Sequence, residues 1–116
     1  MTDERAFPHQ RLDAYQAALA MTKATFEAKI RERDLRDQAQ RAARSVFLQL
    51  SEGLPCDQPA MRMNYFARAR DSLFQLVAAI ELAAVIGAID GACAREIHGY
   101  AVRVRAMLVA LMRAKR

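Results

Sequence analysis

The chain has 116 residues, of which 53% are hydrophobic, with four glycines and three prolines. A chain of this length forms a single domain, residues 1–116, and can bury a core without metal ions or disulfide bonds. No stretch alternates with a period of two residues, so the composition excludes a sheet protein and predicts an all-α fold. The net charge of +5 favours an anionic partner, but it also fits the ordinary solvated faces of an arginine-rich protein.

Residue types that carry catalysis or bind metals are sparse. Cys56 and Cys93 stand alone, without a CxxC pair, and we expect reduced thiols, with a disulfide between them as the alternative. His9 and His98 fall near the starts of the first and last predicted helices, which lie at opposite ends of an antiparallel bundle. We therefore expect no catalytic residue, no metal and no cofactor. The first residues carry charges where an export signal needs an apolar core, which predicts a cytoplasmic protein.

The first predicted helix covers residues 9–31. Its apolar residues recur at intervals of three and four, as on one buried helix face, at Leu12, Tyr15, Leu19, Thr22, Phe26 and Ile30. The segment Lys29–Arg33 then places cations at the end of the helix, where they interact favourably with its dipole. The spacing predicts that this one apolar line packs into the core.

The second predicted helix covers residues 34–52, with Asp34 as its N-cap and Gly53 in the left-handed conformation that ends it. Its apolar face consists of Leu35, Ala39, Ala42, Val46 and Leu50. Beside this face runs a polar seam, which we define as Gln38, Arg41, Ser45, Gln49 and Glu52. We favour an assembly role that fixes the register between helices or subunits, because buried polar groups must find partners. The alternative is a recognition surface for another macromolecule.

The third predicted helix covers residues 59–87, with Asp57 as N-cap and Pro59 in its first turn. Between residues 73 and 89 the only polar side chains are Gln75 and Glu81. A membrane span needs about 20 apolar residues and would place Glu81 in lipid, so we expect no membrane contact. Each helix of a small bundle has an outward face, so apolar residues all round predict a contact with a second subunit. The residues expected there are Phe74, Leu82, Val85 and Ile86.

The fourth predicted helix covers residues 91–114, with Asp90 as N-cap and no acidic residue after Glu96. Short connections predict an up-down-up-down antiparallel four-helix bundle, and we expect it to be oligomeric. An RNA or DNA backbone would be bound by Arg36, Arg44, Arg103, Arg105 and Arg113. Few aromatic residues are present to stack on bases, so sequence recognition is not expected. The alternative function is a protein-interaction scaffold whose charge is incidental, and neither function is enzymatic.

Three segments of the chain resemble the four-helix-bundle family of proteins encoded in intervening sequences of bacterial large-subunit ribosomal RNA genes. They are Arg11–Ala18 (RLDAYQAA), Gln38–Gly53 (QAQRAARSVFLQLSEG) and Asn64–Leu76 (NYFARARDSLFQL). The second is fairly specific and retains Arg41, Ser45, Glu52 and Gly53 of the family pattern, while the others are weak alone. The chain departs from that pattern at Gln40, Phe47, Gln49, Asp71 and Gln75.

This resemblance implies a homo-oligomer, because the family is known for rings of five bundles, and thus predicts a homopentamer. A related branch is the basic accessory protein of diversity-generating retroelements, which works beside a reverse transcriptase and nucleic acid. The expected partners are therefore the chain itself, RNA or DNA and, from this resemblance, a reverse transcriptase or another protein.

Overall fold

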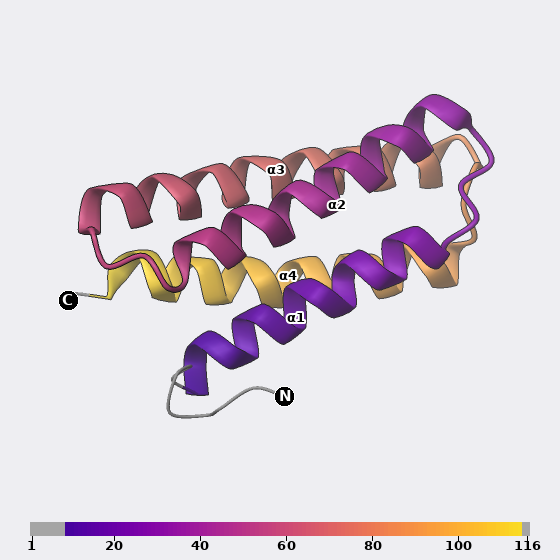
Figure 1. The fold of residues 1–116 in the computed structure, drawn as a ribbon. Helices are drawn as coiled ribbons and strands as arrows, with labels where there is room; N and C mark the ends of the chain where they lie inside the picture. The colour runs from indigo at the N-terminus through magenta and orange to yellow at the C-terminus, as the bar shows by residue number, and fades with distance from the viewer. Residues whose placement is uncertain (1–8, 115–116) are drawn as a thin grey trace.

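The computed structural model describes residues 9–114, and these residues form four helices and no strand (Figure 1). Helix α1 is His9–Glu27, α2 is Arg33–Gly53, α3 is Pro59–Val85 and α4 is Gly91–Arg113. The all-α class predicted from the sequence is confirmed. None of the four helices is both long enough and apolar enough to cross a membrane.

Each helix packs against two others. Figure 1 shows the α1–α2 and α3–α4 connections at one end of the molecule and the α2–α3 connection at the opposite end. Helix α2 packs most extensively on α3, while α4 lies against both α1 and α3. Within the described residues no Cα atoms approach within 8 Å between α1 and α3, or between α2 and α4. These two pairs therefore lie on diagonals, and the core fills the space between the four helices.

The buried face of α1 differs from the predicted one. Leu19 and Phe26, on the expected core line, are 48% and 43% exposed. The helix instead buries a second line with spacings of four and three residues: Ala14, Ala18, Met21 and Thr25, followed after the helix by Ala28. Ala14 and Ala18 let α1 approach its neighbours closely, and Met21 fills core space, so Leu19 and Phe26 point outward while Ile30 of the predicted line is buried after the helix ends. The buried Thr25 hydroxyl is satisfied within the helix, since it donates to the Met21 carbonyl at 2.8 Å.

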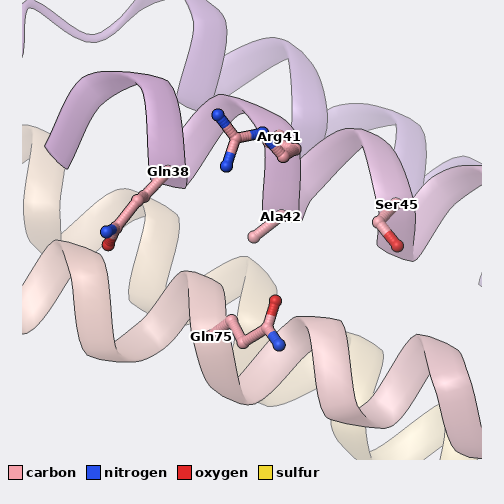
Figure 2. A pocket seen from close by; sticks show the side chains of 5 residues that line it. All are labelled: Gln38, Arg41, Ala42, Ser45 and Gln75. Carbon is pink, nitrogen blue, oxygen red and sulfur yellow. The ribbon is translucent and has the colours of Figure 1, made fainter. Parts of the chain in front are cut away.

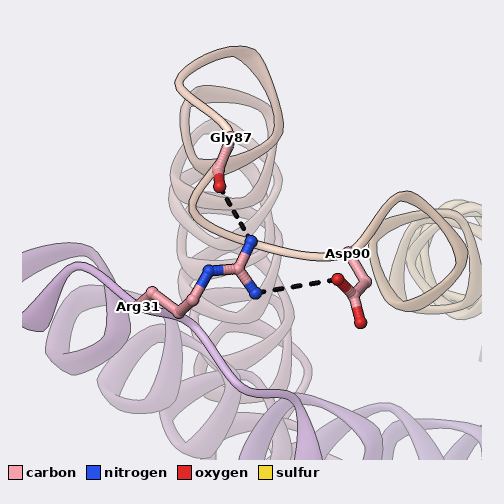
Figure 3. Close-up of polar contacts among 3 residues, drawn as sticks. All are labelled: Arg31, Gly87 and Asp90. Atoms are coloured by element: carbon pink, nitrogen blue, oxygen red, sulfur yellow. Dashed lines mark hydrogen bonds and ion pairs between the residues drawn. The ribbon is translucent and has the colours of Figure 1, made fainter.

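Helix α1 ends at Glu27, four residues before the predicted end, because the following segment bonds to another connection instead of continuing the helix (Figure 3). The Arg31 backbone N–H donates to the Ala88 carbonyl oxygen at 2.7 Å. The Arg31 guanidinium donates to the Gly87 carbonyl oxygen at 2.8 Å and lies 3.6 Å from an Asp90 carboxylate oxygen. The cations of this segment therefore lie outside the last turn of α1, contrary to the prediction.

The caps of α2 and α3 also differ from the prediction. Glu32, not Asp34, caps α2, and its carboxylate accepts from the Leu35 N–H at 2.7 Å. A longer side chain one residue before the helix thus satisfies a free N–H of the first turn. Gln58, not Asp57, is the N-cap of α3, and it caps through its extended backbone position without a side-chain hydrogen bond.

Two glycines at helix ends have different roles. Gly53 is the last residue of α2 and does not adopt a positive φ; its Cα instead lies where an added Cβ would be only 2.7 Å from Cε1 of Phe66. The left-handed conformation predicted for Gly53 is therefore wrong, and close helix packing is its structural reason. Gly87, after α3, has φ of 73° and forms the turn that ends that helix. Helix α3 consequently ends at Val85, and Asp90 is the N-cap of α4 as predicted.

Candidate interaction surfaces

The polar seam of α2 lines an open groove against α3 (Figure 2). Gln38, Arg41, Ala42 and Ser45 from α2 and Gln75 from α3 surround a volume of about 450 Å³. One side of the groove is anchored by the hydroxyl of Ser45, which lies 2.7 Å from that of Ser72 on α3. The groove therefore combines one cation with amides and hydroxyls.

The rest of the seam does not form one continuous network within a single copy. Gln49 is partly buried, and its Oε1 atom has no hydrogen-bond partner, as is also true of the buried Ser51 hydroxyl. Arg41 and Glu52 are both exposed, and they make no ion pair with each other among the described residues. Among the described residues, the Ser45–Ser72 contact ties the seam to α3, while the exposed Gln38, Arg41 and Glu52 stay available to another molecule.

The outward face of α3 presents the four apolar side chains that the sequence assigned to a subunit contact. Val85 is 83% exposed, and Phe74, Leu82 and Ile86 are each between 50% and 54% exposed. Together with the exposed Ala78 they follow one side of the helix at spacings of three and four residues. We call these five residues the α3 face. Large apolar groups gathered in this way mark an interaction surface.

A second apolar surface was missed in the sequence analysis. Leu19 and Phe26 on α1 and Leu48 on α2 are all between 43% and 52% exposed. The rings of Tyr15 and Phe47, whose centroids are 5.1 Å apart, join the two helices beside them. We call these five residues the α1–α2 face. The signal that could have revealed it is the second regular line in α1, formed by Ala14, Ala18, Met21 and Thr25, because only one of two lines can fill the core.

The five arginines predicted to bind nucleic acid lie on two separate surfaces. Arg36 and Arg44 belong to α2, whereas Arg103, Arg105 and Arg113 belong to α4, which does not contact α2. Arg36 is half-buried and the other four are exposed. None of the five makes an ion pair within the described part of the chain. The α4 group has no acidic residue on its own helix after Glu96, and Asp13 of α1 lies against α4 beside Ala110 and Leu111.

The two cysteines are free and belong to distant parts of the molecule. Cys56 lies in the α2–α3 connection and Cys93 in the first turn of α4, near the opposite end of the molecule. A disulfide within one chain, the alternative considered from the sequence, is therefore wrong. Among residues 9–114, no three His, Cys, Asp or Glu side chains come together as a metal site would require.

Residues 10–110 match the family model of the 23S rRNA-intervening sequence protein. The chain belongs to this family. The match takes in all of α2 and α3 and nearly all of α1 and α4, and the resemblance noted in the sequence is confirmed. A comparison with curated proteins finds none that matches the chain.

Two positions where the chain departs from the intervening-sequence family pattern have visible structural roles. Phe47 provides the ring that packs on Tyr15 at the α1–α2 face. Gln75 is the α3 residue that lines the groove opposite Arg41. Phe47 is half-buried and packs against the edge of the core, whereas Gln75 is exposed and open to another molecule.

Proposed function

We propose that this intervening-sequence protein is a non-enzymatic, self-associating bundle whose basic α4 surface binds the backbone of RNA or DNA. The observation that carries the proposal is the α3 face, because a soluble monomer gains nothing from exposing Phe74, Leu82, Val85 and Ile86 together. An up-down-up-down topology is part of the proposal. It is supported by the alternation of the three connections between the two ends of the molecule (Figure 1).

The free energy that burial of the α3 face can supply determines what kind of surface the partner must offer. Burying a large apolar side chain completely contributes about 1.5–3 kcal/mol, so a half-exposed one has about 1 kcal/mol left to gain. The four large residues of the α3 face would therefore supply on the order of 4 kcal/mol. Association costs at least about that much in lost translational and rotational freedom. A stable complex therefore needs a complementary apolar surface on the partner, and not only a polar one.

Nucleic-acid binding is assigned to Arg103, Arg105 and Arg113. Residues two apart on a helix point to opposite flanks, so Arg103 and Arg105 extend the charge across the width of α4, and Arg113 extends it along the axis. Guanidinium groups pair bidentately with phosphate, and their affinity for a backbone does not depend on base sequence. A pentamer, the state that family resemblance implies, would carry five times the single-chain charge of +5, or +25. Such a charge attracts phosphate backbones from a distance.

A salt titration of RNA and DNA binding tests this assignment. Log affinity should fall linearly with log salt concentration, with equal slopes for unrelated sequences. The Arg105→Glu/Arg113→Glu variant should weaken binding to every sequence and reduce the slope by roughly one for each phosphate that is no longer neutralised. The matched control is Arg33→Glu/Arg68→Glu, which makes the same change in net charge on α2 and α3. Binding that does not depend on salt, or that both variants weaken equally, would remove the α4 site.

The second candidate function is a protein-interaction scaffold. The groove of about 450 Å³ between α2 and α3 favours it, because its amides, hydroxyls and single Arg41 suit polar groups of a protein. Co-elution with a purified reverse transcriptase after nuclease treatment separates the two candidates. A complex that survives nuclease and is lost in Arg41→Ala or Gln75→Ala supports the scaffold. A complex that nuclease abolishes supports nucleic acid as the bridge.

A further inference from the structure

We infer that a groove between α3 and α4 binds a short apolar peptide by its two charged ends. The groove has a volume of about 440 Å³, which is within the usual range for small-ligand sites. Its apolar lining consists of Ile80, Ala84, Ala94 and Gly99. A Cβ atom built at Gly99 would meet no atom within 4 Å, so there is open space beside this glycine. The site uses none of the residues to which the proposed function assigns self-association or phosphate binding.

Three polar side chains complete the lining of this groove. Glu81 stands on α3, whereas Arg95 and His98 stand on α4, and all three are exposed. Within residues 9–114, neither Glu81 nor Arg95 makes an ion pair with any other residue. One acid and one guanidinium therefore line the same groove from different helices, and both charges are available to a ligand.

The Arg95 guanidinium lies at the end of the groove nearest the α3–α4 connection. Its Nη1 atom would be only 3.2 Å from a Cβ atom built at Gly91, the first residue of α4. The side chain thus runs back toward the N-terminus of its helix, as long side chains on helices do. The neighbouring acid, Asp90, is directed to Arg31 instead, with 3.6 Å between their charged groups (Figure 3). Arg95 is therefore the cation that a ligand carboxylate meets at this end.

The Glu81 carboxylate lies farther from the connection than the Arg95 guanidinium. Glu81 is four residues before the end of α3, and α3 ends at the same end of the molecule at which α4 begins (Figure 1). Its side chain leans toward the N-terminus of α3, which is away from the connection. At 1.5 Å per residue the two charges are therefore at least about 6 Å apart along the groove. This separation explains why they do not pair with each other.

The separated charges select a ligand with a cationic end, an apolar middle and an anionic end. An extended tripeptide spans up to about 10 Å, which is enough to reach both charges. Its C-terminal carboxylate pairs with Arg95 and its N-terminal ammonium with Glu81, while apolar side chains cover Ile80 and Ala84. His98, one turn beyond Arg95, offers a hydrogen-bonding group to the peptide backbone.

The other charges near the groove do not remove this pattern. Glu96 follows Arg95 directly, is turned by 100° around α4 and is not part of the lining. Arg105 is two turns beyond His98, about 10 Å farther along α4, and is also outside the lining. The acid and the guanidinium in the lining balance each other, so a ligand with only one charge matches only one end of the groove.

An NMR titration of the full chain with the tripeptide Ala-Leu-Ala tests the site, followed at the amide signals of Ala94 and Gly99. The free peptide is compared with its N-acetylated and its C-amidated forms. We expect saturable shifts with the free peptide and an affinity roughly threefold to fivefold weaker for each blocked form, because each loses one exposed ion pair. Glu81→Gln should abolish the preference for a free N-terminus only, and Arg95→Gln the preference for a free C-terminus only.

The matched controls are Glu96→Gln and Arg103→Gln, which make the same charge changes on α4 outside the groove and should bind like wild type. Gly99→Leu fills the groove and should abolish binding while it keeps the wild-type helical circular dichroism, since open space surrounds Gly99. The site is wrong if the free peptide gives no saturable shifts or if both blocked forms bind as tightly as the free one. It is also wrong if the folded Gly99→Leu variant still binds. None of these results bears on self-association or nucleic-acid binding, which are measured separately.

Discussion

Replacing Gly53 by alanine should destabilise the protein, although the residue is helical. In an ordinary helix interior, glycine to alanine gains about 0.5–1 kcal/mol, because alanine loses less backbone entropy on folding. At Gly53 the added Cβ would lie 2.7 Å from Cε1 and 2.9 Å from Cδ1 of Phe66. It would also lie 3.0 Å from Cβ of Tyr65. Contacts this short require α2 and α3 to move apart.

The magnitude follows from what has to move. The Phe66 ring is 2% exposed and cannot rotate into solvent, so the strain passes to the helix backbones. Overpacking of a close-packed core costs about 1–3 kcal/mol. Since Gly53 is the last residue of α2, the helical gain is at the lower end of its range. We expect Gly53→Ala to lower the free energy of unfolding by about 1–2 kcal/mol.

Urea unfolding followed by circular dichroism at a fixed protein concentration measures this difference. The matched control is Gly99→Ala, in the interior of α4, where an added Cβ meets no atom within 4 Å. It should raise the free energy of unfolding by about 0.5–1 kcal/mol. The two alanine variants should therefore change stability in opposite directions.

The variant Gly53→Asn distinguishes two explanations for the glycine, close packing against Phe66 and a left-handed backbone. Asparagine tolerates positive φ better than alanine, so a left-handed Gly53 would make Gly53→Asn the milder change. Under close packing the larger asparagine should be the more damaging of the two. A stability gain in Gly53→Ala, or an asparagine variant more stable than the alanine one, would refute the packing argument.

Three further substitutions test contacts at the helix ends and along the groove. Gly87→Ala should lower the free energy of unfolding by about 1 kcal/mol in urea, because its φ of 73° strains any residue with a Cβ. Arg31→Ala should lower the free energy of unfolding by about 0.5–1 kcal/mol in thermal unfolding, because it removes an exposed hydrogen bond to the Gly87 carbonyl but keeps the backbone bond to Ala88. An unchanged stability would mean that the guanidinium contact contributes nothing. Ser45→Ala should lower the free energy of unfolding by about 1 kcal/mol, because it leaves the Ser72 hydroxyl without its partner. The double variant Ser45→Ala/Ser72→Ala should be closer to wild type in stability. Losses that simply add in the double variant would contradict a direct bond between the two hydroxyls.

The periodicity of α2 was sufficient to predict its buried face. Leu35, Ala39, Ala42, Val46 and Leu50, chosen by spacing alone, are all buried. The polar seam borders this line on the α3 side, and it excludes that flank from the core, so the spacing was sufficient to choose the buried line. On α3, the apolar residues Phe74, Leu82, Val85 and Ile86 lie on the outward face of the single chain, and their contact with a second subunit stays a prediction.

Helix α1 could not be read in the same way. It carries two lines of the same period, one with Leu19 and Phe26 and one with Ala14, Ala18, Met21 and Thr25, and the larger apolar residues of the first favoured the wrong line. Alanine is less hydrophobic than leucine or phenylalanine, but it packs better where two helices approach closely. Which line is buried therefore depends on how closely the neighbouring helices approach. Gly53 was misread for a related reason: a glycine after a helix usually marks a left-handed end, and only the position of Phe66 shows that it makes room for a ring. The α1–α2 face was missed as a direct result.

The hydrogen bonds of Arg31 join the α1–α2 connection to the α3–α4 connection, and Arg31 and Gly87 are 56 residues apart in the sequence. They fasten one end of the bundle, so local opening should begin at the other end, where the α2–α3 connection lies. In hydrogen exchange, the Arg31 amide should be protected although it lies outside any helix, because it donates to Ala88 at 2.7 Å. The fastened end is also the end at which α3 carries Leu82, Val85 and Ile86. These three apolar residues therefore lie beside a hydrogen-bonded end of the bundle, and order that exists before docking lowers the entropy lost when another molecule binds there.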